Sequence, residues 1–285
     1  MKNLVEICTS LDWTEALHNH NRAWYDGNSY KQVKFWIQRI NEENRKMGKW
    51  SIWALLTLTK ANLGHTIEII DHYRSLWLTN IFLRWLNPYG FAAKDIDNLA
   101  YDSQSWIDQY KKSLDYIIEL NKKWESFQES ITSIYLRKIF DPIDPAYMDI
   151  RSPSGLWIWW VAYMYDWKVY ASDESRMLWR MWDDSFFLTD QLATAQETYV
   201  AMIDNPVTKT SIQSSILDWL PGYNDHVYKP YLGVDIIHNY KVSGNIFLPY
   251  KKDEKMSMQI EILDYIFKKL RNPEDAQILK SWINK

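Results

Sequence analysis

The sequence predicts an α/β fold built from parallel βα units, because three apolar runs alternate with amphipathic helices. The runs cover residues 4–11, 52–59 and 78–86, and each has the length of a buried strand. Helical periodicity fills residues 29–45 and 66–76. Apolar strands that alternate with such helices are typical of a parallel sheet covered by helices. Three strands are too few for a closed eight-stranded barrel, so we expect part of one.

The second half of the chain has a different character. A long helix is predicted over residues 107–127, with Tyr110, Leu114, Ile117, Ile118 and Trp124 on one side. A proline-containing breaker at residues 141–145 follows it. Beyond the breaker we expect a loop-rich module with a hairpin around Trp167 and a final amphipathic helix over residues 258–270. The predicted domains are residues 1–140 and 141–285.

Tryptophan is unusually abundant in this chain and glycine unusually scarce. There are 17 tryptophans and only 8 glycines among 285 residues, whereas glycine ordinarily makes up about 7% of a chain. Trp77 lies between a predicted helix and a predicted strand, where a left-handed glycine is usual. Trp167 follows Asp166 in the predicted hairpin turn, where glycine is again favoured. The same pattern holds for Trp13, Trp157, Trp159 and Trp160.

Two interpretations of these tryptophans remain open. They are genuine residues that fill an aromatic core or form a platform for an aromatic ligand. Alternatively, the gene uses a code in which UGA means glycine, and those codons were read as tryptophan.

Charge and cysteine content exclude several classes of protein. The formal net charge is −3 and no long run of Lys or Arg occurs, so we expect no nucleic-acid partner. The longest apolar stretch, residues 156–165, is about half of the roughly 20 residues needed to cross a bilayer. With no signal peptide recognisable either, we expect a cytoplasmic protein without a membrane partner. The single cysteine, Cys8, excludes a disulfide within the chain and is predicted to be a buried thiol.

Six short strings together resemble one enzyme family. They are CTSLDW (8–13), HNHNR (18–22), GNSY (27–30), IFLRWLNPYG (81–90), SPSG (152–155) and VYASDESRML (169–178). In combination they resemble the radical S-adenosylmethionine (radical SAM) enzymes with a SPASM-type extension, most closely the maturase of the His-Xaa-Ser peptide system. The resemblance implies the C-terminal part of a partial β/α barrel, followed by a loop-rich α+β SPASM-like extension. It also implies S-adenosylmethionine and [4Fe-4S] clusters as cofactors, and a peptide substrate or a maturation-system partner.

The chain departs from the family pattern at every cluster ligand. The Cys-x-x-x-Cys-x-x-Cys loop of the family does not occur in this sequence, and the resemblance places residue 1 at the fourth barrel strand. The family's auxiliary-cluster positions fall on Ser154, Ser172, Tyr223, His226 and Leu232. Without thiolates we expect no cluster in this chain. Radical chemistry is therefore expected only if a cluster-binding segment is supplied, and the alternative is a non-catalytic peptide-binding or partner-binding protein on the same scaffold.

The resemblance also assigns candidate site residues. Ser10 and Asp12, after a barrel strand, resemble the segment that faces S-adenosylmethionine, and Arg84 occupies a similar place on a later strand. Alternatively, Ser10 and Asp12 cap a loop or a helix. Asp173 follows a former cluster position and resembles an acidic proton acceptor of some relatives. Its alternative is a surface ion pair with Arg176.

Histidines are the remaining candidates for metal binding. His18 and His20 are two residues apart, so in an extended segment both imidazoles would point to the same side. No third ligand is evident near them, and His226 is a weaker candidate for a residual ligand.

Overall fold

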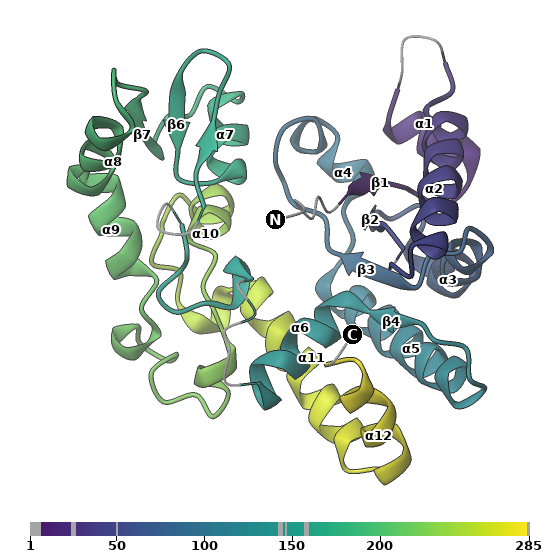
Figure 1. Cartoon of the computed structure of the whole chain (residues 1–285). Helices are drawn as coiled ribbons and strands as arrows, with labels where there is room; N and C mark the ends of the chain where they lie inside the picture. Colours follow the sequence, from purple (N-terminus) through teal and green to yellow (C-terminus); the bar gives the residue numbers. More distant parts are fainter. Residues whose placement is uncertain are drawn as a thin grey trace. The chain divides into compact units, whose positions relative to one another are not determined.

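The computed structural model describes residues 7–23, 27–49, 51–141, 145, 147–156 and 160–283, and the chain divides into two compact units (Figure 1). The first unit comprises Met1–Leu86, Leu99–Asp141 and Tyr265–Lys285, and the second comprises Asn87–Asn98 and Pro142–Asp264. The units are therefore interleaved along the chain, whereas the sequence predicted two consecutive segments. The C-terminal residues belong to the first unit because the last helix packs against two earlier helices there.

A four-stranded parallel sheet forms the centre of the first unit. Its strands, in spatial order, are β1 (Cys8–Ser10), β2 (Trp53–Thr57), β3 (Asn80–Arg84) and β4 (Gln128–Glu129). Its helices are α1 (Glu15–Asn21), α2 (Ser29–Lys46), α3 (Thr66–Ser75), α5 (Ser103–Lys122), α6 (Ser130–Phe140) and α12 (Pro273–Ser281), with the short helix η1 (Leu63–His65). Both α3 and α6 pack against β3. Strands β2 and β3 confirm two of the predicted apolar runs, and β1 lies within the third, of which residues 4–6 lie outside the described residues. Strand β4 has only two residues, so no apolar run marks it in the sequence.

Hydrophobic periodicity explains the position of the helices in this unit. The predicted helices at residues 29–45 and 66–76 are confirmed to within one residue as α2 and α3. Helix α5 buries Trp106, Tyr110 and Leu114 as one apolar stripe. The helix ends at Lys122, before the predicted end at residue 127. The prediction that Trp124 belongs to the buried stripe is wrong, because this residue follows the helix and is 96% exposed.

Cys8 also differs from its prediction. The thiol is exposed, not buried. The reason is that β1 lies at one end of the strand order and pairs only with β2 in the described sheet.

The second unit contains a three-stranded antiparallel sheet and several short helices. The strands are β5 (Ala162–Tyr163), β6 (Lys168–Tyr170) and β7 (Phe187–Asp190), in that order. The helices include α7 (Asp173–Trp179), α8 (Ala195–Asp204), α9 (Pro206–Ser214), α10 (Ile236–Ser243) and most of α11 (Glu254–Leu270), with η2 (Ala92–Lys94), η3 (Met148–Ile150), η4 (Leu217–Trp219), η5 (Lys229–Tyr231) and η6 (Tyr250–Lys252). Helix α4 (Ile96–Leu99) lies where the chain passes between the units.

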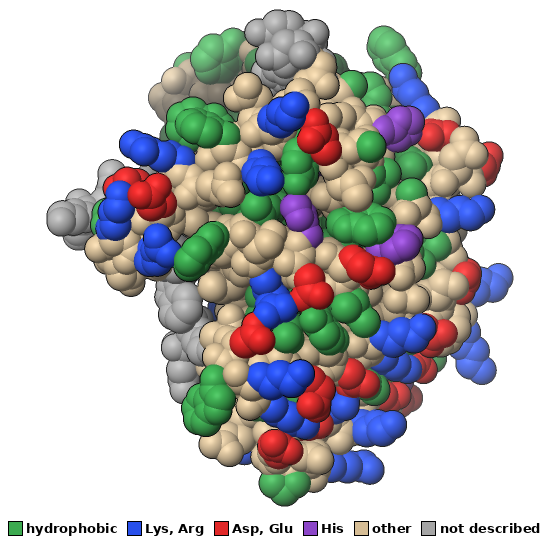
Figure 2. Space-filling model, turned by 90° about the vertical axis from the view of Figure 1, so that its right-hand side faces the viewer, with side chains coloured by type: hydrophobic (Ala, Val, Ile, Leu, Met, Phe, Trp, Pro, Cys, Tyr) green, Lys and Arg blue, Asp and Glu red, His purple; other side chains and the backbone are tan. Residues whose placement is uncertain are grey.

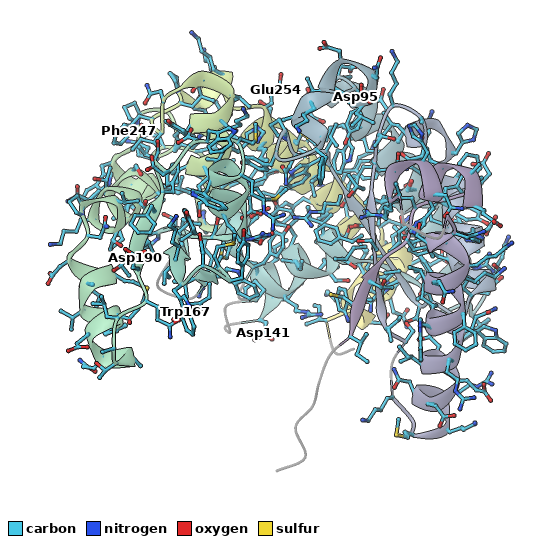
Figure 3. The ribbon with its side chains drawn as sticks, turned by 90° about the horizontal axis from the view of Figure 1, so that it is seen from above. Asp95, Asp141, Trp167, Asp190, Phe247 and Glu254 are labelled. Atoms are coloured by element: carbon cyan, nitrogen blue, oxygen red, sulfur yellow. The ribbon has the colours of Figure 1, made fainter. Side chains whose placement is uncertain are left out.

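The predicted hairpin and final amphipathic helix are both present. Strands β5 and β6 pair antiparallel, and the N–H of Trp167 donates to the carbonyl of Met164 at 3.2 Å to close the turn. Figure 3 labels Trp167, just before β6, and Asp190, which pairs with the first residue of β6. Helix α11 contains the whole predicted helix at residues 258–270.

The tryptophans predicted at glycine-like positions divide into three groups. Trp77 and Trp167 have φ angles of 64° and 66°, as the turn argument predicted. Trp13 and Trp160 are not among the described residues with positive φ, so the argument is wrong for their backbones. Trp157 and Trp159 lie outside the described residues.

Charge is distributed evenly on the face drawn in Figure 2, where acidic and basic side chains are interspersed. Within the described residues, no helix is both long and apolar enough to cross a membrane.

Candidate functional site

The carboxyl ends of β1, β2 and β3 lie along one edge of the parallel sheet. The register aligns Ser10 with Leu55 and Thr57 with Arg84. Ser10 ends β1 and Arg84 ends β3, and both are partly exposed. Neither side chain makes a hydrogen bond or an ion pair with another described residue. A free hydroxyl and a free guanidinium at this edge suit a polar, anionic ligand, and this edge is where barrel enzymes bind theirs.

Asp12, by contrast, is fully engaged inside the protein. Its carboxylate is 1% exposed and accepts from Arg22 Nε and Asn21 Nδ2, each at 3.2 Å. The backbone N–H of Asp12 donates to His18 Nδ1 at 3.1 Å. These contacts tie the loop after β1 to α1 and the residue that follows it. Asp12 is not the N-cap of α1, because Thr14 holds that position, and its carboxylate bonds instead to residues at the far end of the helix.

His18 is a buried neutral imidazole in this network. Because Nδ1 accepts the Asp12 N–H, the ring proton lies on Nε2, and that atom is buried without a partner among the described residues. Burial lowers the pKa of His18, against a smaller opposite effect of Asp12. The extended segment considered for His18 and His20 is a helix, because both lie in α1, where residues i and i+2 point in different directions. His18 is buried and His20 is exposed.

A buried hydroxyl fixes the same loop from another helix. Tyr73 of α3 donates to the carbonyl of Leu11 at 2.5 Å, and neither side chain is exposed. Burial, with the nearby Asp12 carboxylate, raises the pKa of Tyr73 well above its usual value. The hydroxyl is therefore a permanent donor to the loop that follows Ser10.

Glu129 is a site feature that the sequence did not reveal. This residue of β4 is completely buried and accepts from the N–H groups of Leu83, Ile131 and Thr132 and from the Thr132 hydroxyl, at 2.7–3.3 Å. Burial raises the pKa of Glu129 to about 7, although these hydrogen bonds oppose the change. The only signal in the sequence is an acidic residue just before a helix start, the usual place of an N-cap. Glu129 joins β3 to α6.

In the second unit, the neighbouring carboxylates Asp173 and Glu174 have different environments. Asp173 is exposed and forms an ion pair with Arg176 at 2.5 Å, which is the structural alternative considered for it. Glu174 lines a small cavity with Asp149 and Asp235. Burial raises the pKa of Glu174, and the two aspartates raise it further. The affinity of Glu174 for a proton is therefore increased.

Two of the positions that the resemblance aligns with cluster ligands make helix-end and loop contacts. Ser172 is the N-cap of α7, and its hydroxyl accepts from the Ser175 N–H at 3.2 Å in a reciprocal capping box. The N–H of Ser154 donates to Ser215 Oγ at 2.9 Å. Both serines are buried.

The other three positions that the resemblance aligns with cluster ligands also make contacts within the protein. Tyr223 is 1% exposed and donates to Asp253 at 3.2 Å. His226 Nδ1 accepts from the N–H of Tyr228 at 3.1 Å, and Leu232 is buried. Hydroxyl, phenol and alkyl groups are not the ligands of iron–sulfur clusters. Of these five positions only His226 carries a group that can ligate iron, and a lone imidazole without thiolates does not hold a cluster. The described residues contain no group of three or more His, Cys, Asp or Glu arranged to hold a metal ion.

Comparisons with known proteins identify the fold. No family model and no curated protein matches the sequence. Among solved structures, native anSMEcpe with bound AdoMet and Kp18Cys peptide aligns with a TM-score of 0.65 and 12% identity, over 94% of this chain and 69% of that chain. Hexahistidine-tagged anSMEcpe with bound AdoMet aligns with a TM-score of 0.70 and 12% identity, over 97% of this chain and 68% of that chain. Native anSMEcpe with bound AdoMet aligns with a TM-score of 0.68 and 13% identity, over 94% of this chain and 68% of that chain.

These alignments extend over nearly the whole of this chain, so they cover the parallel sheet as well as the loop-rich remainder. At such low identity they bear on fold, and function is a separate question. The chain therefore has the α/β fold of radical SAM/SPASM enzyme structures, as the sequence predicted.

Proposed function

We propose that this chain is a fragment or degenerate member of the radical SAM/SPASM peptide-modifying maturases. Two observations support this proposal. The fold matches anSMEcpe, a sulfatase-maturating radical SAM enzyme, in structures with bound AdoMet and, in one of them, a bound peptide. The observation that carries the proposal is the pair of free side chains, Ser10 and Arg84, at the carboxyl edge of the sheet.

Ser10 and Arg84 fit S-adenosylmethionine, whose methionine part carries a carboxylate and whose ribose carries hydroxyl groups. The Arg84 guanidinium would pair with an anionic group, and the Ser10 hydroxyl would exchange hydrogen bonds. Asp12 would act indirectly, by fixing the loop beside Ser10 through Arg22. When bound to a reduced cluster, S-adenosylmethionine supplies a radical for hydrogen abstraction, and the three-cysteine loop that would hold that cluster does not occur in this sequence.

Activity on a ribosomal peptide would therefore require a cluster-binding segment in addition to these 285 residues. Within the peptide maturases, the sequence strings favour the His-Xaa-Ser system, and this finer assignment is part of the proposal. A role of Asp173 as proton acceptor would require its ion pair with Arg176 to open. Glu174, whose pKa is raised by burial, is the alternative acceptor in this proposal.

A second candidate function is non-catalytic binding of a peptide or a partner protein. Phe35 and Trp36 on α2 favour it, because these side chains are 57% and 56% exposed and pack edge to face with ring centroids 5.3 Å apart. Exposed aromatic pairs are frequent anchors of protein interfaces. This function would need neither Ser10 nor Arg84.

Calorimetric titration with S-adenosylmethionine separates the two candidates. We expect the chain to bind it, and Arg84→Met to weaken binding by about 10- to 100-fold, which corresponds to about 1.5–3 kcal/mol for a hydrogen bond to a charged group. Arg39→Met, on the exposed surface of α2, is the matched control and should bind as the unmodified chain does. Equal binding by both variants, or no binding at all, would favour the second candidate.

A further inference from the structure

One residue type accounts for every left-handed non-glycine position in the described residues. Trp77, Trp124, Trp167 and Trp182 have φ angles of 64°, 65°, 66° and 67°. Asparagine, aspartate and histidine tolerate this conformation best among non-glycine residues, and none of them adopts it here. A bulky aromatic residue is poorly suited to it. The coincidence points to a common cause for the four tryptophans.

Three of the four occupy the same place in the same motif. In a Schellman motif, the left-handed residue and its successor each donate a hydrogen bond back to the last turn of the helix. The pairs are Trp77 to Arg74 at 3.0 Å with Leu78 to Tyr73 at 3.2 Å, Trp124 to Asn121 at 3.0 Å with Glu125 to Leu120 at 3.1 Å, and Trp182 to Trp179 at 2.9 Å with Asp183 to Leu178 at 3.1 Å. Helices α3, α5 and α7 are therefore each followed, within two or three residues of their ends, by a left-handed tryptophan.

Helix α2 ends in the same motif with the residue that normally belongs there. Gly48 has a φ of 63°, its N–H donates to Arg45 at 3.1 Å, and the N–H of Lys49 donates to Asn44 at 2.8 Å. The fourth tryptophan, Trp167, follows Asp166 in the β5–β6 hairpin, where Asp-Gly is the usual pair. All four tryptophans thus stand where glycine is the favoured residue.

The indole rings at these positions contribute little packing. Their exposed fractions are 63% for Trp77, 96% for Trp124, 66% for Trp167 and 98% for Trp182. The indole rings of Trp124, Trp167 and Trp182 make no hydrogen bond, ring contact or cation–π contact with another described residue. Trp77 lies under the Arg45 guanidinium at 4.4 Å and lines one wall of a surface groove. Such an exposed contact is weak.

Other tryptophans are built into the core and have ordinary backbones. Trp85, Trp106 and Trp282 are 6%, 0% and 0% exposed. Trp106 stacks on Tyr110 with centroids 5.2 Å apart and meets Trp85 edge to face at 5.8 Å. A glycine in place of any of these three would leave a large cavity.

We infer that the protein made by its own source carries glycine at positions 77, 124, 167 and 182, through a codon that the source reads as glycine. Trp85, Trp106 and Trp282 are genuine tryptophans. The letter W in this sequence therefore stands for two codons, one for glycine and one for tryptophan. A left-handed backbone marks the positions of the glycine codon. The exposed rings at the four positions are then no aromatic ligand platform, and the groove beside Arg45 loses one wall.

Peptide mass spectrometry of the protein purified from its own source tests this inference. The peptides that span residues 77, 124, 167 and 182 should have glycine masses, and those that span Trp106 and Trp282 should have tryptophan masses. Tryptophan at the four positions would overturn the inference. So would glycine at Trp106 and Trp282, because the proposed separation would then fail.

A stability comparison tests the physical basis separately. The variant W77G/W124G/W167G/W182G should melt at a higher temperature than the tryptophan-containing chain. W106G, in the middle of α5, is the control and should melt at a lower temperature. A four-glycine variant that melts below the tryptophan-containing chain would show that these backbone positions are not built for glycine.

Discussion

At the scale of single residues, the completely buried Glu129 carboxylate makes stability depend on pH. Its folded-state pKa of about 7 lies above the usual 4.5, so the folded protein holds the proton more tightly than the unfolded chain. The stabilisation from this proton is complete below pH 4.5 and is lost as the pH rises through 7. The loss should be on the order of 3 kcal/mol.

Glu129→Gln removes this titration and should flatten the profile of unfolding free energy between pH 4.5 and 7. Urea unfolding at several pH values in that range measures this dependence of the unfolding free energy on pH. Glu254→Gln, at an exposed position of α11, is the control and should leave the slope unchanged. An unchanged slope in Glu129→Gln would show that the carboxylate does not titrate in this range.

A buried ion pair in the second unit gives another prediction at this scale. Lys255 is 4% exposed, and its ammonium group lies 2.6 Å from Asp235. Lys255→Met should lower the free energy of unfolding by about 3–5 kcal/mol, because the Asp235 charge stays buried without its partner. The double variant D235N/K255M should recover most of the loss. Lys46→Met, whose pairs are on the surface, should change stability by less than about 0.5 kcal/mol.

At the scale of elements, exchanging tryptophan and glycine at the ends of helices should change stability in opposite directions. Trp124→Gly should raise the free energy of unfolding by about 1–3 kcal/mol, because it relieves a left-handed tryptophan after α5. Gly48→Trp should lower it by a similar amount, since Gly48 holds the same place after α2. Chemical denaturation of the two variants measures both effects. Changes of the same sign in the two variants would contradict this explanation.

The elements also show what the sequence can predict. Apolar runs and helical periodicity located three strands of the parallel sheet and helices α2, α3 and α11, because their residues bury one continuous face. The turn argument located the left-handed backbones of Trp77 and Trp167, because the conformation of a turn is decided by the few residues within it. Strand β4 was missed because its two residues are polar, and its place depends on pairing with β3. Glu129 was missed because its complete burial and its hydrogen bond from Leu83 exist only in the assembled sheet. The Lys255–Asp235 pair was missed because its two residues are distant in sequence. Cys8 was misplaced because an edge strand is recognised only in the assembled sheet.

At the scale of the whole molecule, the fold could be predicted from the sequence more fully than the contacts of the site. The strings that resemble radical SAM/SPASM enzymes gave the correct fold class, and the structure places Ser10 and Arg84 on one edge. Asp12 lies nearby but its carboxylate is already paired with Arg22. Pairing of this kind depends on the loop and helix that follow β1, so residue type and spacing alone did not reveal it.

The absence of cluster ligands is the central claim about the molecule. Iron should be measured after anaerobic reconstitution of the chain with iron and sulfide, followed by removal of unbound metal. The Cys8→Ala variant is the matched control, because Cys8 is the only thiol in the sequence. We expect the chain to retain no more iron than this variant and to show no sulfur-to-iron charge-transfer absorption. Stoichiometric iron with that absorption in the unmodified chain would contradict the account.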